Sequence, residues 1–360
     1  MINFRYHVVS IVAVFLALAI GIVLGATELQ GATLDALRAS SKNLHNDLNA
    51  SQNQNQALQQ QVTADTGFAQ ASEGRLLDSL LTNQRVVVVA APGAPGNVVS
   101  GVTSAAQKAG AAVTGQVNLQ PKLLDASENN LQFLSALVQQ LVSPGGTAPN
   151  GTPLQQAAQL LGTAILTKTG PATSGTGGPS SGSTVESSAS NRQNVLSSYT
   201  RAGLLTVSGS LGTSQSSSAT LAIVVIPATP PPGGNSVAAN QGLITLAQQL
   251  DTAGLGTVMA GSVTGSVAGS AINALRTSSA GAQISTVDDA DTMAGQIVTV
   301  LSLADALTGH KASSYGEDAG ASAVAPSPAP TPASSTPATT STGSKTTKTT
   351  KRTTKTGSHK

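Results

Sequence analysis

Apolar residues fill the chain from Val8 to Ala26 without a single charged side chain. At ~1.5 Å of rise per residue, a helix of this length reaches ~28 Å, close to the ~30 Å thickness of the hydrocarbon core of a bilayer. A cleavable signal peptide is the alternative interpretation, but its apolar core is usually only ~7–15 residues long. The pattern therefore predicts a membrane-spanning helix that is retained as an anchor, which we place at residues 1–27.

The charges that flank this apolar segment predict its orientation. Arg5 precedes the segment, whereas Glu28 and Asp35 are the first charged residues after it. Because positively charged flanks tend to stay in the cytoplasm, we expect a cytoplasmic N-terminus and an extracytoplasmic bulk of the chain. Membrane lipid is then a partner, and the residues expected at the interface with its headgroups are Arg5, Tyr6 and His7.

A heptad pattern of apolar residues follows the anchor and predicts a coiled-coil stalk over residues 28–66. Asn55 occupies a core position of the heptad, where a polar side chain can fix register and strand number. A helix packed against its own globular domain is the alternative. A coiled coil implies a homo-oligomer, and the residues expected at its contact are Leu34, Leu37, Leu44, Leu48, Asn55, Leu58 and Val62.

Short apolar runs alternate with helical patterns through residues 82–316. The run from Arg85 to Ala90 is followed by a Gly/Pro loop and a helical pattern, and the run from Thr220 to Pro227 begins a similar series. Repeated strand, loop and helix units are typical of α/β domains, so we predict a mostly parallel sheet flanked by helices. The Gly/Ser-rich residues 170–190 interrupt this pattern and predict a flexible insert.

The loop after the first apolar run contains Gly93 and Gly96. In an α/β sheet, a loop at this place and the helix N-terminus behind it can hold an anion. The glycine spacing matches neither the dinucleotide-binding nor the P-loop fingerprint. The favoured interpretation is therefore a structural turn.

Composition narrows the possible chemistry. The chain has no Cys and no Trp, and only four Phe and three Tyr, so Val, Leu, Ile and Ala must form the core. The lack of Cys excludes a disulfide framework and any thiolate metal site. No Ser-His-Asp, zinc-protease or P-loop signature is found, so we expect neither an enzyme nor a required cofactor.

Three carboxylates lie within four residues just before a predicted helix, at Asp288, Asp289 and Asp291. Oxygen ligands of this kind suit a hard cation such as Ca²⁺ or Mg²⁺. Alternatively, they cap the helix N-terminus and complement its dipole. Met293 and His310 are nearby residues with softer or borderline donor atoms. The candidate metal ligands are therefore these five residues.

Residues 317–360 combine Pro, Ser and Thr with spaced cations and predict a disordered tail. No acidic residue follows Asp318, so these cations are available to an anionic cell-wall polymer or to lipid headgroups, and no nucleic acid is expected as a partner outside the cytoplasm. A solubilising tail without a partner is the alternative. The expected surface-binding residues are Lys345, Lys348, Lys351, Arg352, Lys355 and Lys360.

Three segments together resemble the mycobacterial copper transport protein B family of actinobacteria. They are FRYHVVSIVAVFLALAIGIVLG near the N-terminus, RVVVVAAPGA at the first apolar run, and ISTVDDADTMAGQIVTVLSLADALTGHKASSYG near the end of the α/β region. The resemblance covers roughly residues 1–316. It implies a role in copper homeostasis, with copper as the transported ion, as an outer-membrane or channel-type exporter in the cell envelope.

Two function classes follow from these observations. The first is a membrane-anchored envelope protein in copper transport, which the resemblance implies. Because one helix cannot enclose a pore, a channel would require oligomerisation. The second is a structural protein that holds an α/β domain away from the membrane on a coiled-coil stalk. Four heptads would span roughly 42 Å at ~1.5 Å per residue.

Overall fold

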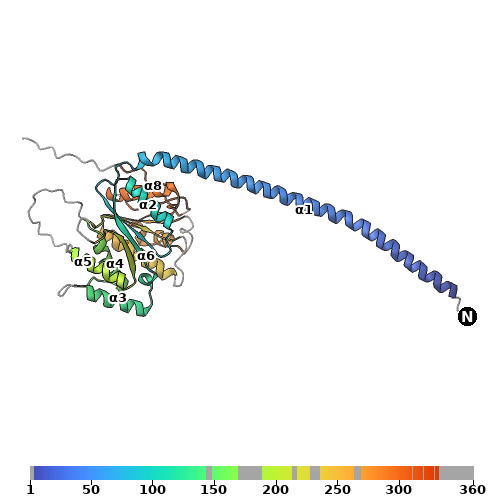
Figure 1. The fold of residues 1–360 in the computed structure, drawn as a ribbon, viewed down its shortest axis with the longest axis horizontal. Helices are drawn as coiled ribbons and strands as arrows, with labels where there is room; N and C mark the ends of the chain where they lie inside the picture. The colour runs from blue at the N-terminus through green and yellow to red at the C-terminus, as the bar shows by residue number, and fades with distance from the viewer. Residues whose placement is uncertain are drawn as a thin grey trace, which may run out of the picture. The chain divides into compact units, whose positions relative to one another are not determined.

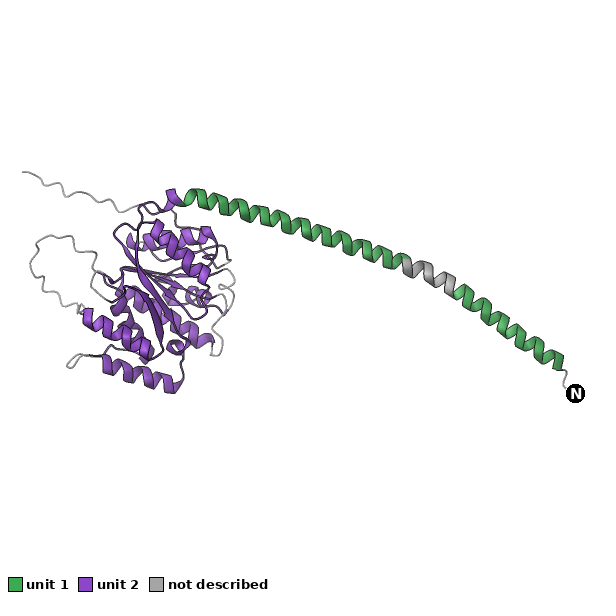
Figure 2. Ribbon diagram, in the orientation of Figure 1, with its two compact units in different colours: residues 1–73 green, residues 74–360 purple. Residues whose placement is uncertain are grey.

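The computed structural model describes residues 4–142, 148–168, 189–212, 217–227, 236–262, 269–309, 311–318, 320–327 and 329–331, without the side chains of residues 26–34. The chain divides into two compact units, residues 1–73 and residues 74–360 (Figure 2). The predicted insert 170–190 lies outside the described residues except for its last two.

The first unit is a single helix. α1 runs from Phe4 to Leu77 without a break, and its last turn belongs to the second unit (Figure 1). Residues Phe4–Gly25 have a mean hydropathy of 2.9, and none of the segment is buried in the structure. This stretch is long and apolar enough to cross a membrane, so the apolar N-terminal helix predicted from the sequence is confirmed. The predicted anchor and stalk form one continuous helix.

The second unit is built on a seven-stranded mixed sheet with the order β3-β2-β1-β4-β5-β6-β7. Every neighbouring pair is parallel except β2 and β3, which are antiparallel. The predicted α/β fold with a mostly parallel sheet is thus confirmed. The strands are β1 Arg85–Ala90, β2 Ala112–Leu119, β3 Leu205–Gly209, β4 Leu221–Val225, β5 Gly256–Ala260, β6 Ser285–Val287 and β7 Ser314–Tyr315.

Helices cover both faces of this sheet, with α2 and α8 on one side and α4 and α6 on the other (Figure 1). The central strands β4 and β5 are fully buried, which explains their continuous apolar sequences. The helices of this unit are α2 Gly96–Lys108, α3 Glu128–Leu141, α4 Pro153–Ile165, α5 Ala189–Arg201, α6 Ser236–Ala253, α7 Ala271–Arg276 and α8 Met293–Leu307, with short 3₁₀ turns at Pro121–Leu124 and Ser279–Ala282.

The core lies between the sheet and the layer that contains α4 and α6. Alternate residues of β1 and β4, such as Val87 and Val224, point into it, because side chains along a strand alternate between the two faces. Tyr199 of α5 is fully buried there, and its hydroxyl donates a hydrogen bond of 2.8 Å to the carbonyl of Ala157. Burial raises the pKa of this phenol well above its usual range. Val86 and Val88 are buried on the opposite face, toward α2 and α8, so aliphatic layers with few aromatic rings lie on both faces of the sheet.

Candidate functional site

The acidic cluster predicted from the sequence lies directly after β6. Asp288 is fully buried, and its Oδ2 lies 2.8 Å from Nη1 of Arg276 at the end of α7. Its Oδ1 accepts a hydrogen bond of 2.9 Å from the backbone N–H of Glu317. Arg276 also donates to Thr286 Oγ1 and to the carbonyl of Tyr315, both at 2.9 Å. The ion pair between Asp288 and Arg276 thus joins α7, β6 and β7.

Asp289 lies beside this pair but faces a different environment. The residue is 1% exposed, and its Oδ1 has no hydrogen-bond partner in the structure. Burial raises the pKa of this carboxyl to about 6, and the nearby negative charges of Asp288, Glu317 and Asp291 act in the same direction. A protonated carboxyl can remain in such a site because it carries no charge to desolvate.

The remaining members of the predicted metal set do not join these two carboxylates in the described part of the chain. Asp291 is exposed and Met293 is the first residue of α8, while His310 lies outside the described residues. The described residues contain no group of three or more His, Cys, Asp or Glu side chains arranged to hold a metal ion. Metal binding by this set therefore stays a prediction.

The N-cap residue of α8 is a threonine and not one of the three aspartates, which the sequence had offered as an alternative to metal binding. Thr292 is the N-cap residue, and its hydroxyl accepts a hydrogen bond of 3.0 Å from the backbone N–H of Gly295. Threonine performs this role because its side-chain oxygen reaches the third helical N–H from extended backbone. The aspartates precede the cap, so their contribution to the helix start is limited to charge.

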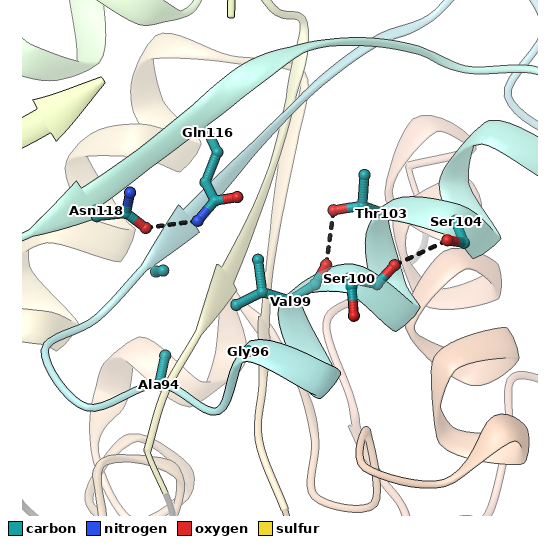
Figure 3. A pocket seen from close by; sticks show the side chains of 9 residues that line it. Ala94, Gly96, Val99, Ser100, Thr103, Ser104, Gln116 and Asn118 are labelled. Carbon is teal, nitrogen blue, oxygen red and sulfur yellow. Dashed lines mark hydrogen bonds between the residues drawn. The ribbon is translucent and has the colours of Figure 1, made fainter. Parts of the chain in front are cut away.

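The structure also shows an open hollow of about 470 Å³ at the carboxyl end of β1, beside the glycine loop for which the sequence favoured a structural turn over a ligand site. It lies between α2 and β2 (Figure 3). Its described lining consists of Ala90, Ala94, Gly96, Val99, Ser100, Thr103, Ser104, Gln116 and Asn118. In open α/β sheets, ligands bind outside the carboxyl ends of the strands where the strand order reverses, and β1 and β4 are that point here. Residues 228–235, which follow β4, lie outside the described residues.

The polar groups around the hollow are neutral. Thr103 Oγ1 and Ser104 Oγ donate to carbonyls of their own helix, at 2.6 Å and 2.9 Å, and the amide of Gln116 donates to Asn118 (Figure 3). The nine described lining residues include no charged side chain and no nucleophile with an adjacent base. Hydroxyl and amide groups of this kind can form hydrogen bonds to a neutral ligand, but they supply no acid, base or copper ligand.

The glycine loop at the edge of this hollow is a turn. Gly93 has φ of +82°, a conformation that residues with a side chain rarely adopt. Gly96 begins α2, and its preceding residue Pro95 provides no side-chain cap. The positive φ of Gly93 therefore supports the interpretation of this loop as a structural turn.

Most of the predicted stalk residues are exposed along the first unit. Leu37, Leu44, Leu48, Leu58 and Val62 each expose more than half of their surface, and Asn55 is also exposed. The side chain of Leu34 lies outside the described residues. Arg5, Tyr6 and His7 belong to the first turns of α1 and are exposed. The six tail cations, from Lys345 to Lys360, lie outside the described residues.

Comparisons with known proteins identify relatives over nearly the whole chain. The sequence profile of a family described as "Copper transport outer membrane protein, MctB" matches residues 1–326. A protein named copper transporter MctB from Mycobacterium tuberculosis strain H37Rv is 30% identical over 334 residues, which cover 90% of this chain and 99% of the relative. A protein of the same name from Mycobacterium leprae is 32% identical over 332 residues, with the same coverage.

Proposed function

Because this chain belongs to the MctB family of copper transport outer membrane proteins, we propose that it acts in copper transport at the cell envelope. The observation that carries the proposal is the extent of the match, which includes the apolar helix, the stalk and the α/β unit up to residue 326. The proposal includes no enzymatic reaction and no resident cofactor. Copper is the cargo.

Membrane anchoring is the part of the proposal that the first unit supports. Residues Phe4–Gly25 form an exposed apolar helix, and Arg5 lies at its start. The protein is therefore expected to keep its N-terminus in the cytoplasm and its α/β unit outside, with Tyr6 and His7 near the headgroups. The family description names the outer membrane, whereas a cytoplasmic N-terminus requires an anchor in the inner membrane. The two agree in placing the protein in the cell envelope.

A more specific part of the proposal is that copper is exported through an oligomer of this chain or through a complex with another protein. Cu(I) prefers Cys and Met sulfur or imidazole, but the whole chain has no Cys, three Met and four His. A single apolar helix cannot surround a pore. We therefore place copper passage in an oligomer or in a complex with another protein, with the α/β unit held on the outer side of the membrane.

The test is a strain that lacks the gene, grown under copper load. We expect it to accumulate more cell-associated copper than its parent and to tolerate less copper, and the full chain should restore both properties. A chain without residues 1–27 should not restore them, because it lacks the anchor. Cell-associated zinc serves as the control. Unchanged copper accumulation and tolerance in the deletion strain would contradict the proposal.

A structural role is the second candidate, and the length of α1 favours it. α1 is an uninterrupted helix of 74 residues, and all but its last turn precedes the α/β unit. In this role the protein would hold the α/β unit at a distance from the membrane without handling copper itself. Titration of the purified protein with Cu(I) separates the two: stoichiometric binding supports direct participation in transport, and no binding supports the structural role.

A further inference from the structure

The large apolar residues between residues 37 and 62 of the stalk are exposed and form one narrow stripe. Leu37, Leu44, Leu48, Leu58 and Val62 are between 52% and 70% exposed. At ~100° of rotation per residue, their side chains fall within an arc of about 80°. A helix that packs on a globular domain usually carries an apolar stripe at least ~100° wide, whereas a narrower stripe is typical of a coiled-coil seam. The width therefore favours another helix as the partner.

A polar residue interrupts the stripe near its middle. Asn55 is exposed and occupies a core position of the heptad, between Leu48 and Val62. Opposite an apolar surface its amide would lose hydrogen bonds to water without replacement. Opposite Asn55 of a second copy, the two amides can bond to each other, which fixes the register of the pair. Asn55 therefore favours self-pairing over an unrelated apolar partner.

The charge distribution around the stripe agrees with self-pairing. The flanking heptad positions are mostly neutral, as in Gln52, Gln54 and Gln59. The charged flanking residues are Arg38 and Asp47. Arg38 Nη1 forms an exposed ion pair of 3.2 Å with Asp35 Oδ1 of its own helix, and a parallel in-register pair would set Asp47 opposite the neutral Gln52 of the second copy. Two copies can thus approach along the stripe without placing like charges against each other, which would be destabilising.

We propose that residues 37–62 of α1 pair with the same segment of a second copy as a parallel, in-register, two-stranded coiled coil. Leu occupies three of the four d positions, with Ser51 at the fourth, and Asn55 and Val62 occupy a positions, a combination that favours two strands. The parallel direction rests on the membrane anchoring in the proposed function, because both copies enter the same bilayer through the same helix. The pairing holds for either copper transport or the structural role.

Cysteine cross-linking tests the pairing, and the natural chain offers a background without Cys. Ser41→Cys and Ser51→Cys place single thiols at the two remaining seam positions, and Asn53→Cys places one on the opposite side. With the full chain in membranes and diamide as oxidant, we expect both seam variants to form a species of twice the 35.5 kDa chain mass, and Asn53→Cys to remain monomeric. Paired seam positions meet the short Cα–Cα distance that a disulfide needs.

The same experiment distinguishes the other arrangements. An antiparallel pair can bring at most one of Ser41 and Ser51 opposite its own copy, so cross-linking at only one of them overturns the parallel register. If Asn53→Cys cross-links as much as the two serine variants, the cross-links arise from random collision, and the proposed contact along the stripe is wrong. No cross-linking at either serine also overturns the proposal.

Mass measurement provides a second, independent readout. For the full chain in detergent, light scattering should give the protein mass of two chains, and the double variant Leu44→Glu/Leu48→Glu should give one, with unchanged helical circular dichroism. The mass of one chain or of three for the unaltered protein would overturn the two-stranded form. These readouts involve no copper, so the pairing and the copper function can fail separately.

Discussion

Nη1 of Arg276 lies 2.8 Å from Oδ2 of Asp288, and the two side chains are 6% and 0% exposed. The pair connects the end of α7 to the end of β6, and a second Arg276 nitrogen holds the carbonyl of Tyr315 in the edge strand β7. Removing one partner of a buried pair leaves an uncompensated charge, which is far more costly than removing both.

Replacing Arg276 with Leu should therefore destabilise the protein strongly. We expect Arg276→Leu to lower the free energy of unfolding by about 3–5 kcal/mol, because Asp288 is left buried without its cation. The double variant Arg276→Leu/Asp288→Leu should regain a large part of this loss. Urea denaturation followed by circular dichroism measures both variants.

The exposed pair between Arg38 and Asp35 supplies the control. Arg38→Leu should change the free energy of unfolding by no more than about 1 kcal/mol, because water screens exposed ion pairs. Equal effects of Arg38→Leu and Arg276→Leu would contradict the structural role of the buried pair.

Asp289 should make stability depend on pH. Burial raises the pKa of Asp289 from 3.8 to about 6, so between these values the folded state binds more protons than the unfolded state. The free energy of unfolding should then fall as pH rises from about 4 to about 6 and stay lower above that range, by at most ~3 kcal/mol. Urea denaturation at a series of pH values measures this change.

Two amide variants isolate this effect. Asp289→Asn should remove the fall between pH 4 and pH 6 and stabilise the protein at neutral pH, because the amide is never charged. The matched Asp291→Asn change affects an exposed carboxylate of the same segment and should leave the fall in place. A fall that persists unchanged in Asp289→Asn would assign the pH dependence to other groups.

The sequence predicted the main elements because their patterns are local. A continuous apolar run such as β1 indicates a strand buried on both faces, and uncharged residues from Val8 to Ala26 indicate a membrane helix. The antiparallel direction of β3 could not be read in the same way, because its pairing with β2 joins residues about 90 positions apart. Element type thus followed from the sequence, and strand direction required the tertiary structure.

The candidate sites, like the direction of β3, depend on contacts between distant parts of the sequence. The cluster around Asp288 was visible because its carboxylates are adjacent in sequence, but its partner Arg276 lies on another element and carries no pattern of its own. The hollow is formed by α2 together with Gln116 and Asn118 of β2. The loop with Gly93 and Gly96 marked this place in the sequence, but its glycine spacing matched no ligand-binding fingerprint. Side chains from separate elements meet only after folding, so neither arrangement could be predicted.

A glycine substitution tests how closely α8 packs on the acidic segment. A Cβ added to Gly295 would overlap the backbone carbonyl of Asp289, which cannot move without shifting β6 or α8. We expect Gly295→Ala to lower the free energy of unfolding by about 1–3 kcal/mol, despite the higher helix propensity of Ala. Thermal and urea denaturation measure the loss.

Gly101 in α2 is the matched control for this change. The three atoms nearest to a Cβ there belong to the side-chain amide of Gln296, which can rotate away. Gly101→Ala should therefore cost less than Gly295→Ala, and the gain in helix propensity offsets part of that cost. If Gly101→Ala were the more damaging of the two, the packing of α8 against Asp289 would not be the dominant constraint.

For the cations from Lys345 to Lys360 we propose binding to an anionic surface. The chain returns from Ala323 to hydrogen-bond with Ser314 and Gly316, so a deletion must begin after these contacts. Removing residues 332–360 satisfies this condition.

Each cation near a charged membrane contributes about 1 kcal/mol at low salt, and the attraction weakens as salt shortens the Debye length. We expect the full chain to be retained on isolated cell-wall material at low salt and released at high salt, and the truncated chain to be released throughout. A full-length variant with all six cations changed to Gln separates charge from tail length, and it should behave like the truncated chain. Equal retention of all three proteins would leave the tail a solubilising segment without an anionic partner.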